Sequence, residues 1–288
     1  MEIKKLKTSI DGKFKLEAEI YIPQTKEKLA GILISHGFLS AKEEFGELPQ
    51  NLASKGYIVM TYDFRGHGKS DGLKGFYNFE SHLNDIERAF NLLLSQDNID
   101  KEKIALIGHS MGCTASLRFI NESPLAKNIK TLILLAPPRK FSDGLSKINL
   151  FLYKLISNTL ASLFLKFNKH LYLPYIYSAK DLFINSDSIK KAENLNFLQK
   201  SMPVENYQYL IKEIDNENFA KNIKIPSLIV VAKKDKIIPN NFSKQVFNAL
   251  NSELKEYKEI ENSGHSMMTD ESSKLLEKII LNYLEKFL

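Results

Sequence analysis

The chain has 288 residues, of which 43% are hydrophobic and 26% charged, a net charge of +6 and a single cysteine. This composition is ordinary for a globular protein, and the length suffices for one large core or a core with a sizeable insertion. The basic residues are spread along the chain beside acidic ones, and few of them are arginines, which argues against a nucleic-acid partner. A lone cysteine excludes an intrachain disulfide and favours a reducing compartment. With no signal-peptide pattern and no run of ~18 apolar residues, we expect a cytoplasmic protein without a membrane span.

The first half of the chain alternates strand and helix patterns. Residues 14–22 alternate apolar and charged side chains, which predicts a half-buried antiparallel strand. Short apolar runs predict buried strands, with helices between them; the strands are 30–35, 57–64, 104–107 and 130–135, and the helices are 41–55, 79–96 and 114–120. This alternation predicts a parallel sheet with crossover helices, so the strands' carboxyl ends share one edge, where sites form.

The alternation breaks between residues 139 and 205. No buried strand is predicted there, and an apolar stripe at helical spacing runs through 152–167. We therefore expect a mainly helical insertion at 139–205, which divides a core made of residues 1–138 and 206–288. The sheet pattern returns afterwards; its strands are 226–232 and 254–260, and its helices are 240–250 and 272–288.

A G-x-S-x-G pattern, Gly108-His109-Ser110-Met111-Gly112, lies between a predicted strand and a predicted helix. This context is typical of a sharp turn that exposes one serine hydroxyl, with glycines where side chains would crowd the turn. The following helix directs its N-terminal N–H groups toward that hydroxyl. Ser110 is therefore the candidate nucleophile.

A serine nucleophile needs a base, and the base needs a carboxylate that orients it. Asp235 and His265 each follow a predicted strand, and the order Ser110, Asp235, His265 is that of an α/β-hydrolase triad. Asp215 follows a helix and Asp270 lies too near His265 in sequence, so we favour Asp235 as the acid.

The oxyanion formed on attack needs two N–H donors. The backbone N–H of Met111 is one candidate, and the loop after strand 30–35 offers Phe38, with Leu39 as the fallback. His36 and His109 flank the site, and we expect both to orient loops.

In combination, these motifs resemble the α/β-hydrolase superfamily, and within it the group of monoacylglycerol lipases, lysophospholipases and serine aminopeptidases. The resemblance rests on Gly108–Gly112, Asp235, Gly264-His265, His36-Gly37 and the glycine-rich stretch 63–70. It implies a mostly parallel eight-stranded sheet flanked by helices, a helical cap over the site at 139–205, the triad above, and an oxyanion hole from Phe38 and Met111. The chain departs from the group at Ala232, where a glycine is common.

This pattern predicts a serine hydrolase that cleaves carboxylic esters of acyl chains, without a metal or another cofactor, since no ligand spacing or phosphate loop is present. The apolar stripe has two interpretations: a cap helix packed on the core, or a lid whose apolar face lines an acyl tunnel or touches a lipid surface. We expect Leu39, Leu155 and Phe164 to contact the substrate.

In the alternative interpretations the same triad serves a thioesterase, an acyltransferase or an aminopeptidase. An aminopeptidase needs acidic side chains that hold the substrate amine, and the cap candidates are Asp181, Asp187, Glu193 and Glu205. A binding protein on a hydrolase scaffold is the least favoured interpretation, because the triad is intact.

Overall fold

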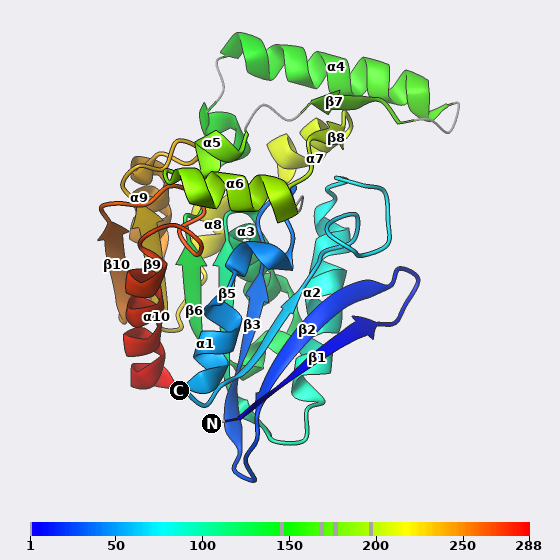
Figure 1. Cartoon of the computed structure of the whole chain (residues 1–288). Coiled ribbons are helices and arrows are strands. Elements are labelled where there is room, and N and C mark those ends of the chain that lie inside the picture. The colour runs from blue at the N-terminus through cyan, green and yellow to red at the C-terminus, as the bar shows by residue number, and fades with distance from the viewer. Residues whose placement is uncertain (1, 145–146, 167–169, 175–177, 196–197) are drawn as a thin grey trace.

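The structure is a computed structural model that describes residues 2–144, 147–166, 170–174, 178–195 and 198–288. Its centre is one eight-stranded sheet with the order β1-β2-β4-β3-β5-β6-β9-β10 (Figure 1). The strands are β1 (Ile3–Ile10), β2 (Leu16–Pro23), β3 (Leu29–Ser35), β4 (Ile58–Tyr62), β5 (Ile99–His109), β6 (Ile129–Leu135), β9 (Ser227–Ala232) and β10 (Lys255–Ile260). From β4 to β10 neighbouring strands are parallel, and β2 and β1 add antiparallel pairs at one edge. The predicted α/β-hydrolase fold with a mostly parallel eight-stranded sheet is confirmed.

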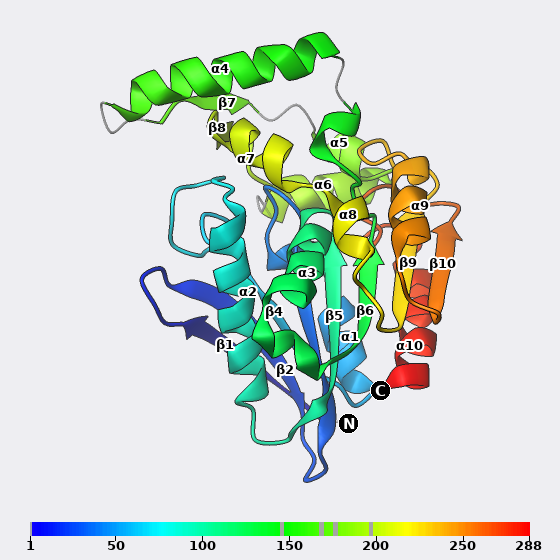
Figure 2. The same ribbon diagram turned by 180° about the vertical axis from the view of Figure 1, so that it is seen from behind.

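Helices cover both faces of this sheet, so its central strands are buried on both sides and read as unbroken apolar runs. Ile34 of β3 pairs with Ile107 of β5 and packs toward α1 and α10, whereas Leu33 and Leu106 pack toward α2 and α3. Figures 1 and 2 show these two layers from opposite sides. The layer helices are α1 (Leu48–Ser54) and α10 (Ser273–Phe287) on one face, and α2 (Phe79–Leu94), α3 (Met111–Glu122), α8 (Asn216–Ala220) and α9 (Asn240–Ala249) on the other.

The differences from expectation include a divided helix and an additional edge strand. The helix predicted over 41–55 is split into a 3₁₀ turn, η1 (Lys42–Phe45), and α1, because Gly46 between them has a φ of +54° that ends the first helix. Strand β1 was not predicted, since its lysine-rich residues, which are mostly half-buried or exposed, carry little apolar alternation. Such a charged strand suits an open sheet edge.

The segment between β6 and β9 lies across the carboxyl edge of the sheet (Figure 1). It contains η3 (Phe141–Gly144), α4 (Lys147–Leu165), β7 (Tyr172–Pro174), α5 (Ala179–Leu182), α6 (Ser186–Leu195), β8 (Ser201–Pro203) and α7 (Asn206–Glu213). Strands β7 and β8 form a separate antiparallel pair, and α4 packs on α7, where the rings of Tyr153 and Tyr207 stack with centroids 4.3 Å apart. Within the described ranges, no helix is long and apolar enough to cross a membrane.

Candidate active site

Ser110 occupies a sharp turn between the end of β5 and the start of α3. Its φ of +51° and ψ of −114° lie outside the regions that L-residues favour, so the turn is strained. A Cβ on Gly108 would lie 2.5 Å from the carbonyl oxygen of Gly112, and one on Gly112 would lie 2.2 Å from that of Ser35. The turn therefore requires both glycines of the motif, and the N–H of Ser110 is held by the Leu135 carbonyl at 2.9 Å.

His265 and Asp235 lie side by side although they follow different strands. The Nδ1 atom of His265 is 2.7 Å from Oδ2 of Asp235, and both side chains are almost fully buried. The other oxygen of Asp235 accepts the N–H groups of Ile237 and Ile238 at 2.7 and 2.9 Å. This arrangement fixes the carboxylate and leaves Nε2 of His265 for proton transfer.

The two rival acids are used elsewhere. Asp270 accepts the N–H of Gly264 at 2.8 Å and so shapes the loop that carries His265. Asp215 caps α8 and pairs with Lys140 at 3.2 Å. Of these three acids, Asp235 is the one bonded to His265.

Two cavities meet at Ser110. The larger has a volume of about 140 Å³, and its lining is mainly apolar, with Phe38, Met111, Met202, Leu210, Ile238 and Phe242 among the residues. The smaller has a volume of about 40 Å³ and is lined by Ser110 and His265 together with Leu39, Leu182 and Gln199. Ser110 therefore lines both an apolar cavity and a smaller one that His265 also lines.

The predicted oxyanion donors belong to two different segments of the chain. Met111 is the first residue of α3, whose N-terminus favours negative charge, and Phe38 lies in the loop after β3. Both line the larger cavity with Ser110. Leu39, with a φ of +54°, accepts the N–H of Gln199 through its carbonyl at 2.8 Å, which links this loop to the segment before β8.

The predicted substrate contacts are only partly brought together. Leu39 lines the smaller cavity, whereas Leu155 is 47% exposed on α4 and lines neither cavity. Phe164 belongs to α4, and its side chain lies outside the described residues. Sequence reasoning missed Met202, Leu210 and Phe242, because an apolar pattern does not tell which apolar side chains will surround a cavity.

The outer face of α4 is apolar and exposed. Its exposed side chains recur at the spacing of one helix face, and they are Ile148, Phe151, Leu152 and Leu155. The opposite face, with Tyr153 and the fully buried Ser157, packs on α7. The sequence of α4 contains no acidic residue.

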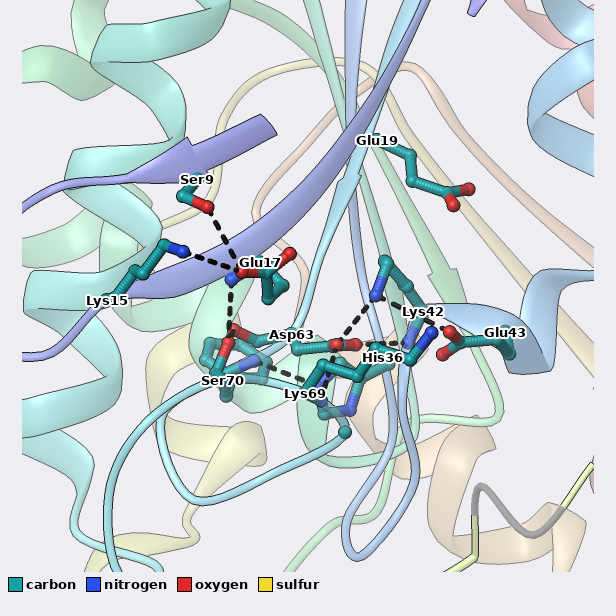
Figure 3. A network of polar contacts seen from close by, with 12 residues as sticks. Ser9, Lys15, Glu17, Glu19, His36, Lys42, Glu43, Asp63, Lys69 and Ser70 are labelled. Atoms are coloured by element: carbon teal, nitrogen blue, oxygen red, sulfur yellow. Dashed lines mark hydrogen bonds and ion pairs between the residues drawn. The ribbon is translucent and has the colours of Figure 1, made fainter. Parts of the chain in front are cut away.

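A buried polar network supports the loop after β3 (Figure 3). Asp63, which follows β4, accepts the N–H of Lys42 at 2.8 Å, its Nζ at 2.7 Å and the N–H of Lys69 at 3.0 Å. His36 accepts the N–H of Phe64 on Nε2 and donates from Nδ1 to the Gly37 carbonyl. These contacts tie the loop that carries Phe38 to the end of the neighbouring strand.

A second buried pair, Glu44 and His109, lies next to the site. Their closest atoms, Oε1 and Nδ1, are 2.9 Å apart. The sequence drew attention to His109 but not to Glu44, because Glu44 reads as an ordinary charge in a predicted helix. Within the described part of the chain, no group of three or more His, Cys, Asp or Glu side chains is arranged to hold a metal ion.

The comparison with protein families is decisive for classification. The family model described as serine aminopeptidase S33 matches residues 26–272. The chain belongs to this family of α/β hydrolases. The match extends from the loop before β3 to the residue before α10, so it includes Ser110, Asp235, His265 and the segment above the sheet edge.

Similar proteins agree with this S33 assignment. A putative esterase/lipase of Mycoplasma genitalium is 28% identical over 239 residues, which are 81% of this chain and 78% of that protein. A monoglyceride lipase homolog of monkeypox virus is 29% identical over 126 residues, so the match spans 43% of this chain and 44% of the viral protein. The solved structure of a monoglyceride lipase variant from Saccharomyces cerevisiae has a TM-score of 0.79 at 16% identity, covering 99% of this chain and 95% of that one. At that identity the structural match shows the shared fold.

Proposed function

We propose that the protein is a serine hydrolase that cleaves carboxylic esters of acyl chains through an acyl-enzyme. The observation that carries the proposal is the position of Ser110, on a strained turn that lines both an apolar cavity and the smaller cavity that His265 lines. The names of the relatives from Mycoplasma genitalium and monkeypox virus favour the same esterase or lipase chemistry.

In the proposed mechanism, Nε2 of His265 takes the proton of the Ser110 hydroxyl as the oxygen attacks the ester carbonyl. The N–H groups of Met111 and Phe38 stabilise the oxyanion, and each such donor lowers the barrier by roughly 3 kcal/mol. His265 then protonates the departing alkoxide, so an alcohol leaves and an acyl-Ser110 ester remains. Water, deprotonated by His265, hydrolyses that ester, and Asp235 holds the imidazole in the required tautomer throughout.

The two cavities give the substrate a direction. The leaving oxygen must come within reach of His265, and His265 lines the smaller cavity, so the alcohol belongs there. The acyl chain then occupies the larger apolar cavity, where its burial contributes about 0.8 kcal/mol per methylene. We therefore propose esters of small alcohols with acyl chains of short to medium length.

The family description makes an aminopeptidase the second candidate. That activity needs an acidic side chain free to bind an amine beside Ser110. Among the described lining residues, Asp143 is bound to Arg139 and Glu44 to His109, while the four cap acids predicted for this role line neither cavity. These pairings favour an ester over a peptide with a free amino terminus.

We also propose that residues 139–205 act as a cap and that α4 touches a lipid surface. An exposed apolar face combined with lysines and no acidic residue suits a helix lying in the interface of an anionic membrane.

We propose the cytoplasm as the location of the protein, because Cys113 is a buried free thiol.

The lipid contact is tested by sedimentation with vesicles of phosphatidylcholine and phosphatidylglycerol. The double variant F151S/L155S should bind at least ten times more weakly than the unchanged protein, because two apolar side chains no longer enter the interface. The matched control is L275S, which alters a similarly exposed leucine on α10 and should bind normally. Equal binding of all three proteins, or none by the unchanged protein, would contradict the contact.

The catalytic proposal is tested with p-nitrophenyl esters. S110A should lose at least ~10⁴-fold in kcat and should not react with a fluorophosphonate probe, since no other group supplies the nucleophile. Full activity of S110A would refute the mechanism.

A further inference from the structure

Glu44 and His109 form a buried ionisable pair that the proposed reaction does not use. Glu44 lies in η1, and His109 is the last residue of β5, directly before Ser110. Each is 2% exposed, and both line the smaller cavity. Burying two ionisable groups costs free energy, and such a pair often contributes little net stability.

The hydrogen bonds assign the protons of this pair. Nε2 of His109 lies 3.1 Å from the carbonyl oxygen of His265, which only accepts, so Nε2 carries a hydrogen. Nδ1 faces Oε1 of Glu44, and the same oxygen accepts the N–H of Gly37 at 2.8 Å. An ionised Glu44 therefore requires a second hydrogen on His109, at Nδ1.

The pKa directions agree with this assignment. Burial raises the pKa of Glu44, but the charge and hydrogen bond of His109, together with His36 and Ser40, lower this pKa by more. Burial lowers the pKa of His109, but Glu44, together with the His265 carbonyl and Asp235, raises this pKa by more. Both directions favour a carboxylate on Glu44 and an imidazolium on His109.

The pair contacts three loops that the reaction must hold together. Glu44 binds Gly37, the residue before Phe38; His109 precedes Ser110 and binds the main chain of His265. A Cβ on Gly37 would lie 3.2 Å from Nδ1 of His109, so the packing there is tight. The rings of His109 and His265 have centroids 4.8 Å apart.

We propose that Glu44 and His109 are positioning residues that hold the general base and an oxyanion donor at fixed distances from Ser110. The inference rests on the proposed function, because it concerns the same Ser110 and His265. Catalytic groups lose rate when displaced by a fraction of an ångström, so a rigid charged link between the three loops acts on kcat.

The test compares E44Q and H109Q with the unchanged protein in the hydrolysis of methyl butanoate. Each variant should lose about 10- to 100-fold in kcat, because the link between the loops is weakened. KM should change less than threefold, because neither residue lines the larger cavity, where the acyl chain binds. The matched control is E43Q, whose more exposed carboxylate pairs with Lys42, and it should keep its kcat.

A double variant shows whether Glu44 and His109 act through one shared link or contribute to kcat independently. E44Q/H109Q should be no slower than the slower single variant, because each change already breaks the same link. The proposal would be overturned if the loss in kcat of the double variant equalled the product of the two single losses. It would also be overturned if each single variant kept a kcat within twofold of that of the unchanged protein, whatever its thermal stability.

Nitrogen-15 NMR of the unchanged protein at pH 7 tests the charge state without a variant. Both ring nitrogens of His109 should carry protons, and a neutral ring would overturn the inference. S110A is measured alongside: an active S110A refutes the proposed function, whereas an inactive S110A with a fully active E44Q refutes the positioning role alone.

Discussion

Asp235 uses both carboxylate oxygens, one for His265 and one for two backbone N–H groups. An asparagine keeps the size of the side chain but removes its charge and changes the tautomer that His265 adopts. We therefore expect D235N to lose about 10³- to 10⁴-fold in kcat, measured with p-nitrophenyl butanoate.

D215N is the matched control for this substitution. Asp215 caps α8, and asparagine is an equally good cap residue, so kcat should stay within twofold. A comparable loss of activity in both variants would show that the effect on D235N does not come from the orientation of His265.

Among single residues, the candidate catalytic residues were predictable from local sequence patterns, whereas contacts between residues far apart in the sequence were not predictable. Ser110 was found from two glycines between a strand and a helix, and Asp235 and His265 from their places after strands. Glu44 was missed because its partner His109 lies 65 positions away, and no sequence period links them.

At the scale of elements, α7 forms part of the wall of the larger cavity. Leu210 on this helix is buried and lines the cavity, so L210W should shorten the space for the acyl chain. We expect at least a tenfold loss in kcat/KM for octanoate esters and little change for acetate esters, measured over chain lengths C2 to C16. Equal losses for all chain lengths would contradict the assignment of this cavity to the acyl chain.

Strongly periodic elements were predictable, and elements set by tertiary contacts were not. The buried strands β4 and β9 and the amphipathic α2 follow their sequence patterns closely. The break at Gly46 depends on its positive φ. Glycine adopts positive and negative φ about equally readily, so the sequence does not show which one occurs here. Strands β7 and β8 have three residues each, too few for any period to be recognised.

At the scale of the whole molecule, two buried histidines make stability depend on pH. Burial, aided by the neighbouring His36, lowers the pKa of His67 to about 3, and burial lowers the pKa of His82 well below its usual value. No hydrogen-bond partner for either ring nitrogen of His82 is found in the described chain. The unfolded chain binds these protons more readily, so this stability is full above pH ~6.5 and is lost as the pH falls toward 3.

We expect each of these histidines to lower the free energy of unfolding by up to about 1.4 kcal/mol per pH unit below pH 6.5. H82F keeps the ring stacked on Phe64 and removes one of the two groups. In urea unfolding, the free energy of unfolding should therefore differ less between pH 7.5 and pH 5.0 for H82F than for the unchanged protein. An equal difference would contradict the role of His82.

In the mechanism that we propose, Ser110 carries the acyl group during turnover. The most direct measurement is mass spectrometry of the protein quenched with acid during hydrolysis of p-nitrophenyl butanoate, followed by peptide mapping. We predict one butanoyl group per chain, on the peptide that contains Ser110, and none on S110A. Turnover without an adduct on that peptide, or with an adduct on another residue, would contradict an acyl-Ser110 intermediate.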